Sequence, residues 1–196
     1  MTWTLRDIEN DREIVRAIDG HDDRAAAILA GAYLEDRLLA TIKTRLVSDG
    51  KALKRFFTGI GPLVTFSAKI DLSYLLGIFD PKTTEILHIV RSIRNEFAHN
   101  LSPISFSTPV IAKLCNRLFY SEKIKDLKST NEVAFQNCPA LLEMNTVLLS
   151  PLVELSNTPR NAYMNTIKVL LFMMELSKAS VSMRETDTLQ IISRQD

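Results

Sequence analysis

Apolar residues recur every three or four positions along most of this chain, which is the spacing that gives an α-helix one buried face. The strongest patterns span residues 23–47, 82–100 and 159–178. Weaker patterns predict further helices at 4–19, 61–77, 109–120 and 140–149, and residues 51–57 could form a short one. No segment shows the polar and apolar alternation of a strand. The sequence therefore predicts an all-α protein, a single-domain multi-helix bundle of about six or seven helices.

Start and stop signals frame these helices. Asp22 or Asp23 is placed to cap the helix that follows, and three sites put a capping residue directly before a proline: Asp80-Pro81, Thr108-Pro109 and Thr158-Pro159. We expect one domain over 1–196 with its core at about 22–178. Residues 1–20 would form an N-terminal helix or arm, 121–139 a loop and 180–196 a mobile tail.

The end of the helix predicted over 82–100 carries the most distinctive chemistry. At about 100° per residue its apolar residues share one arc. A second arc, about 80° wide, collects His88, Arg91, Asn95 and His99. Arg94 lies about 60° to the side of Arg91, where its stem can pack while its guanidinium reaches outward.

These residue types are the ones needed to cleave RNA through its own 2′-hydroxyl, which requires a proton carrier and a cation beside the developing phosphorane charge. His99, in the last helical turn, is suited to carry the proton. Arg94 or Arg91 would hold phosphate oxygens, and Asn95 would fix the backbone or a further oxygen. Arg94 and His99 are about 140° apart on an ideal helix. They therefore converge only if the helix loosens or a second subunit supplies one of them.

A structural role fits the same residues, and we prefer it. The polar stripe would face Glu35 or Asp36 on a neighbouring helix and fix the helix register through hydrogen bonds. Lys69 would belong to this network if it paired with Glu35 or Asp71, but we expect its long side chain to reach solvent instead. With Lys69 included as the conditional member, the candidate structural polar network is Glu35, Lys69, Arg91, Arg94, Asn95 and His99.

Composition narrows the function classes. With 24 Lys and Arg against 23 Asp and Glu among 196 residues, the formal net charge is +1, so no overall field draws the chain to nucleic acid or an anionic membrane. Cys115 and Cys138 are too few for a disulfide framework and lack metal-ligand spacing. No signal peptide, membrane span, glycine-rich phosphate loop or nucleophile elbow is visible. We expect a cytoplasmic protein with no metal, cofactor or membrane contact.

Two stretches resemble the mannitol operon repressor family of bacteria, and together they cover roughly residues 22–101. The first is Asp23-Arg-Ala-Ala-Ala-Ile-Leu-Ala-Gly-Ala-Tyr-Leu-Glu35. The second begins at Gly61-Pro-Leu-Val-Thr-Phe-Ser and ends at Arg94-Asn-Glu-Phe-Ala-His99. The resemblance implies an all-helical regulator of sugar-operon transcription that lacks a recognised DNA-reading helix and acts through protein partners. The absence of a basic helix-turn-helix pattern agrees with this.

The run Arg94-Asn95-Glu-Phe-Ala-His99 is also similar to the Arg-to-His signature of the HEPN superfamily. Many members of that superfamily are dimeric, metal-independent ribonucleases or toxins. Carried over by position, the resemblance implies that Arg94 and His99 are the catalytic pair and Asn95 an auxiliary residue.

Our preferred hypothesis is a regulatory and interaction protein, resembling a repressor and not an enzyme, that binds protein partners and forms a homodimer without reading DNA directly. The alternative is a metal-independent, toxin-like endoribonuclease that acts on RNA, with Arg94, His99 and Asn95 as catalytic residues at a dimer interface.

Overall fold

The computed structural model describes residues 5–118 and 158–192, with side chains placed over 10–118 and 158–178. Helices make up most of this part of the chain: α1 Leu5–Asp19, α2 Asp23–Lys43, α3 Gly50–Phe57, α4 Phe66–Leu75, α5 Pro81–His99, α6 Pro109–Cys115 and α9 Pro159–Ile192. No strand occurs in the described residues. The prediction of an all-α helical bundle is confirmed.

The capping residues explain where most helices begin. The side chain of Asp22 accepts a hydrogen bond from the backbone N–H of Ala25 (3.0 Å), and that of Asp80 accepts one from Thr83 (2.7 Å). Each bond satisfies one of the N–H groups that the first helical turn leaves without a partner. Thr108 differs from the expectation, because its hydroxyl accepts from Ser105 N–H and makes no cap bond to α6.

Four helices differ in extent from the predicted ones. The helix predicted over 61–77 spans only α4, Phe66–Leu75. α2 ends at Lys43 and not near Val47, and α6 ends at Cys115 and not at Tyr120. α9, expected to end near Lys178, continues as a helix to Ile192. The loop predicted at 121–139 and the helix predicted at 140–149 lie outside the described residues.

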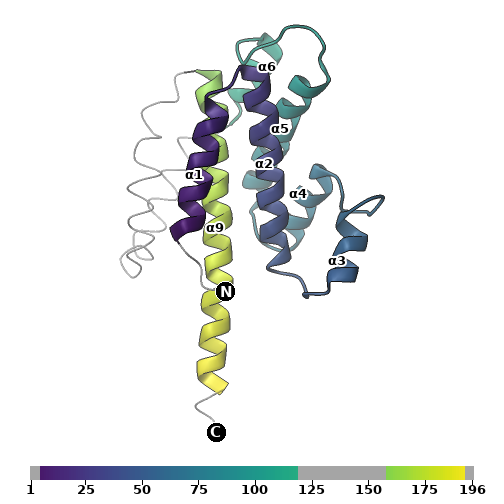
Figure 1. The fold of residues 1–196 in the computed structure, drawn as a ribbon, viewed down its shortest axis with the longest axis vertical. Coiled ribbons are helices and arrows are strands. Elements are labelled where there is room, and N and C mark those ends of the chain that lie inside the picture. The colour runs from purple at the N-terminus through teal and green to yellow at the C-terminus, as the bar shows by residue number, and fades with distance from the viewer. Residues whose placement is uncertain (1–4, 119–157, 193–196) are drawn as a thin grey trace.

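Helix α2 occupies the centre of the bundle. It packs against α1, α4, α5 and α9. Figure 1 shows α1, α2 and α9 running side by side along the long axis, with α3 and α4 on the far side of α2 from α9, where α4 packs against α2 and α5. The apolar arc predicted on α5 faces inward: Ile86, Ile89, Val90, Ile93 and Phe97 are all buried.

Three aromatic rings join α5 to α9. The ring of Phe97 lies 4.9 Å from that of Phe106 between centroids, and Phe106 lies 5.3 Å from Tyr163, both in tilted arrangements. The Tyr163 hydroxyl, fully buried, donates a hydrogen bond to the Ala27 carbonyl of α2 (3.0 Å). Apolar burial and one satisfied hydroxyl thus fix the meeting point of α2, α5 and α9.

A glycine allows α2 and α5 to approach closely at this point. A Cβ added to Gly31 would lie 2.7 Å from Cγ and 3.0 Å from Cβ of Arg94, and 3.4 Å from the Tyr163 hydroxyl. Carbon atoms that are not bonded do not approach to 2.7 Å without displacement. The stem of Arg94 therefore packs directly on the α2 backbone, where no larger residue than glycine fits.

We predict that Gly31→Ala lowers the free energy of unfolding by about 1–2 kcal/mol, because the cost of overpacking exceeds the gain in helix propensity. Equilibrium urea unfolding followed by circular dichroism measures the change. Gly50→Ala is the matched control, since a Cβ there meets nothing within 4 Å. The packing argument fails if both substitutions stabilise the protein equally.

Candidate functional site: the polar side of helix α5

The helix that carries the Arg-to-His motif keeps its α-helical geometry to its end. α5 runs through His99, and the backbone N–H of Asn100 still bonds to the Glu96 carbonyl (3.1 Å). The loosening that would bring Arg94 and His99 together is therefore absent. Within one chain the two side chains leave the helix about 140° apart.

Arg94 and Asn95 are brought together, and both are half-buried. Nη1 of Arg94 donates a hydrogen bond to Oδ1 of Asn95 (3.0 Å), while its stem rests on Gly31. The Nε of Arg94 is buried and has no hydrogen-bond partner in the described residues. This cation also lies near the buried Tyr163. Burial raises the pKa of Tyr163, and the positive charge of Arg94 offsets a part of that rise. Arg94 thus belongs to the junction of α2, α5 and α9.

His99 and Arg91 are not drawn into this contact. His99 is exposed and Arg91 half-buried, and within the described residues the side chain of neither makes a hydrogen bond or ion pair. The expected second arc is divided further by His88, whose Nε2 lies 3.0 Å from Oδ1 of Asp71 on α4. The structure therefore gathers Arg94 with Asn95 and leaves the other members of the stripe apart.

Arg24, at the start of α2, occupies the end of α5. Its Nη1 donates to the carbonyls of Phe97 (2.6 Å) and Asn100 (2.8 Å), and its Nη2 donates to that of Ser102 (2.8 Å). The last carbonyls of a helix lack intrahelical partners and attract a cation. The contact spans 73 residues or more, so no local pattern indicates it.

Glu35 and Lys69 form an ion pair between α2 and α4. Nζ of Lys69 lies 2.5 Å from Oε1 of Glu35 and also donates to the Val64 carbonyl (2.9 Å). The Lys69 side chain is only 8% exposed. The expectation that it reaches solvent was wrong, because its ammonium is bound by two acceptors between α2 and α4. Glu35 therefore faces Lys69, and no hydrogen bond or ion pair joins it to Arg94 or His99.

A second charged cluster, absent from the sequence analysis, ties α1 to α2 and α9. Arg37 lies 3.2 Å from Oδ2 of Asp11 and 2.5 Å from Oε1 of Glu175, and Lys178 lies 2.6 Å from the same glutamate oxygen. The Tyr33 hydroxyl donates to Asp11. Burial raises the pKa of Asp11 above its usual range, although Tyr33 and Arg37 favour the charged form. The only local signal was a set of charged residues within otherwise apolar helices.

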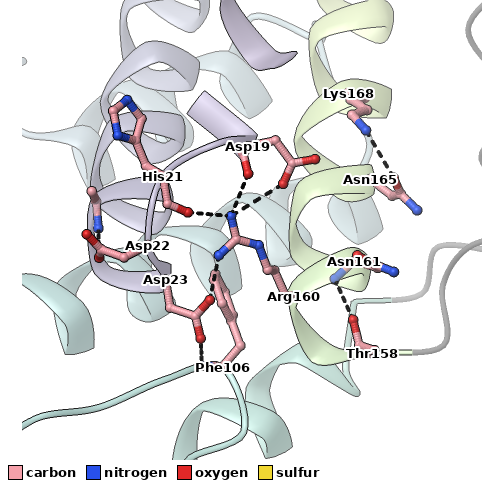
Figure 2. Close-up of polar contacts among 11 residues, drawn as sticks. Asp19, His21, Asp22, Asp23, Phe106, Thr158, Arg160, Asn161, Asn165 and Lys168 are labelled. Atoms are coloured by element: carbon pink, nitrogen blue, oxygen red, sulfur yellow. Dashed lines mark hydrogen bonds and ion pairs between the residues drawn. The ribbon is translucent and has the colours of Figure 1, made fainter. Parts of the chain in front are cut away.

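Arg160 makes the third polar junction, at the start of α9 (Figure 2). Its Nη1 lies 2.5 Å from the Asp23 carboxylate, and its Nη2 donates to the carbonyls of Asp19 and His21, each at 2.8 Å. The other oxygen of Asp23 accepts the backbone N–H of Phe106 (2.9 Å). Arg160 thereby fixes the turn between α1 and α2 against α9, with the loop before α6 held by the same carboxylate.

The described residues offer no cluster of three or more His, Cys, Asp or Glu side chains that would hold a metal ion. Cys115 is buried, and burial raises its pKa to about 12, so its thiol stays protonated and unreactive. Among the described helices none is long and apolar enough to cross a bilayer.

Comparison with known proteins supports the fold. No family model matches the chain, and no curated protein matches it. The X-ray structure of the MtlR–HPr complex from Escherichia coli is similar, with a TM-score of 0.57 and 16% identity, over 86% of this chain and 99% of the matched one. The chain therefore has an MtlR-like fold, which agrees with the fold implied by its resemblance to the mannitol operon repressor family.

We predict that Lys69→Met lowers the free energy of unfolding by about 2–4 kcal/mol, because Glu35 and the Val64 carbonyl lose their buried cation. The double variant Lys69→Met with Glu35→Leu should recover most of this loss, since no charge is then left unpaired. Arg117→Met breaks the exposed Arg117–Glu85 pair and should change stability by less than about 1 kcal/mol. Equal losses in the free energy of unfolding for Lys69→Met and Arg117→Met, measured by urea unfolding, would refute the interpretation.

Proposed function

We propose that this chain is a helical regulatory protein that acts in transcription control by binding a protein partner, without reading DNA directly. The similarity to MtlR carries the proposal, because it extends over 99% of the matched chain and that chain was solved in a complex with HPr. A likeness of this extent covers the whole scaffold and not one common helical hairpin. An HPr protein is accordingly the first partner to test.

Within this proposal the Arg-to-His motif has a structural role. Support comes from Arg94, whose stem fills the space over Gly31 and whose guanidinium is hydrogen-bonded to Asn95. The Glu35–Lys69 pair supports a similar role in the seam between α2 and α4. Arg91 and His99 contribute little to it, since neither makes a polar contact in the described residues. The structural network then reduces to Glu35, Lys69, Arg94 and Asn95.

Self-association into a homodimer and a cytoplasmic location belong to the same proposal. The cytoplasmic location follows from the resemblance to the mannitol operon repressor family, since a regulator of operon transcription works where transcription occurs. The homodimer stays a prediction of the sequence analysis. Sedimentation of the purified chain would test the first directly.

The partner prediction is tested by isothermal titration of the full chain with the HPr protein of the same organism. We expect a saturable complex with a Kd below about 10 μM, equivalent to a binding free energy of about −7 kcal/mol. A duplex DNA of mixed sequence is the control and should give no saturable, sequence-dependent binding. A folded protein that fails to bind HPr but binds DNA tightly would overturn the proposal.

A second assay addresses RNA cleavage. With divalent metals chelated, the purified protein should release no 2′,3′-cyclic-phosphate ends from a structured RNA. The physical reason is that Arg94 and His99 leave one continuous helix about 140° apart. Cleavage by the parent protein that disappears in His99→Ala would contradict this and would favour the endoribonuclease alternative, with the second residue supplied by a partner chain.

A further inference from the structure

The corner of the molecule formed by residues 43–65, here called the α3 lobe, carries an uneven share of charge. Five lysines and arginines stand against a single acid, Asp49, which gives a net charge of +4. Since the whole chain has a net charge of +1, the remaining residues sum to −3. The near-neutral total therefore hides a strongly basic lobe.

The positive charges of α3 point away from the core. Phe57 is buried and Leu53 packs against the hydrophobic core, whereas Lys51, Lys54 and Arg55 are exposed. On a helix these three cations span about 100° on the side opposite Leu53 and Phe57. Asp49 caps α3, since its carboxylate accepts hydrogen bonds from the backbone N–H groups of Lys51 and Ala52. Its negative charge is already included in the net charge of +4.

Apolar side chains border this basic face. Phe56 is 41% exposed and lies beneath the guanidinium of Arg55, 5.5 Å from its ring centroid. Ile60, in the turn after α3, is fully exposed. Within the described residues, large exposed apolar side chains are concentrated between positions 47 and 75: Val47, Phe56, Ile60, Tyr74 and Leu75.

The turn that presents Ile60 is held firmly against α3. Gly59 has a positive φ of 64°, and a Cβ on Gly61 would lie 2.4 Å from the carbonyl oxygens of Arg55 and Phe56. The backbone N–H of Leu63 also bonds to the Phe56 carbonyl (3.0 Å). Ile60 is therefore presented to solvent by a fixed backbone, which lowers the entropy cost of binding through it.

The anionic partners that such a surface could bind differ in what they require. A membrane-surface helix turns its apolar face to the lipid, but α3 has already turned that face to the core. Nucleic acid binding at physiological salt depends on many phosphate contacts. The α3 lobe exposes four cations, Lys43, Lys51, Lys54 and Arg55, because Arg45 is half-buried and hydrogen-bonded to Ser177 of α9. An aromatic ring, an arginine and an aliphatic side chain surrounded by charge are typical of protein interfaces.

We propose that the α3 lobe is a docking surface for an acidic segment of protein, with Lys51, Lys54 and Arg55 meeting carboxylates while Phe56 and Ile60 receive an apolar side chain. Charge complementarity requires a negatively charged partner. The exposed apolar pair, Phe56 and Ile60, adds an apolar contribution to binding. The inference goes beyond the proposed regulatory function and does not depend on HPr as the partner.

The test uses the full chain and a short fluorescein-labelled peptide of Glu, Asp, Leu and Phe, with binding measured by fluorescence anisotropy at about 0.15 M salt. A peptide with Lys in place of the acids is the control. The acidic peptide should bind at least about tenfold more tightly. Ile60→Ser and Lys54→Glu should each weaken it at least about fivefold.

Two variants outside the lobe match these substitutions. Leu101 is exposed to the same degree as Ile60, and Lys113 is an exposed lysine of α6. Leu101→Ser and Lys113→Glu should leave binding within about twofold of the parent. Circular dichroism shows whether each variant is folded. If Ile60→Ser is unfolded, the binding of Lys54→Glu alone tests the proposal.

Several outcomes overturn the inference. They are equal binding of both peptides, no binding of the acidic one, and equal losses in the lobe and control variants. Tighter binding to phosphatidylcholine vesicles with about 30% phosphatidylserine, or to single-stranded RNA, would assign the lobe to lipid or nucleic acid instead. Since HPr is absent from this assay, its result is separate from that of the HPr titration.

Discussion

The contact between Gly31 and the stem of Arg94 is the constraint on which the centre of the bundle depends. It brings the α5 side chain onto the α2 backbone, next to the Tyr163 hydroxyl that bonds to α2 from α9. Three helices meet there with no space for a methyl group. Because the arginine's stem is used in packing, its guanidinium has limited freedom, and the bond to Asn95 restricts it further. A residue type that suggests phosphate chemistry is here packed, half-buried, at the junction of α2, α5 and α9.

Charged residues then fix the register of each helix that packs on α2. Arg24 holds the end of α5, Glu35 pairs with Lys69 of α4, and Arg37 links α1 to α9. Asp23 binds the guanidinium of Arg160 on α9. Sliding α2 by one turn along a neighbour would separate at least one of these pairs and leave a part-buried charge without its partner, which is costly. Apolar packing alone tolerates such shifts more readily.

Local sequence signals were enough for the presence of the described helices and for the starts capped by Asp22 and Asp80, since caps and prolines act within a few residues. They did not show that the Thr108 hydroxyl bonds to Ser105 and leaves α6 without a side-chain cap. They were not enough for the pairs between helices. Lys69 was expected to reach solvent because lysine stems usually do, and only the position of α4 on α2 shows that Glu35 and a carbonyl meet its ammonium. Arg24 acts on carbonyls more than 70 residues away. The helical period identifies the face of a side chain but not its partner.

The same pairing explains why net charge misdescribes this protein's surface. Cations such as Arg37 and Arg160 are bound to carboxylates between helices, so their fields are largely cancelled at short range. Lys51 and Lys54 form no ion pair in the described residues, and one acid, Asp49, lies beside them as the cap of α3. The charges that an approaching molecule meets are therefore mainly the unpaired ones. A chain with a total of +1 can thus present a basic surface at one corner while the cations between its helices are paired with carboxylates.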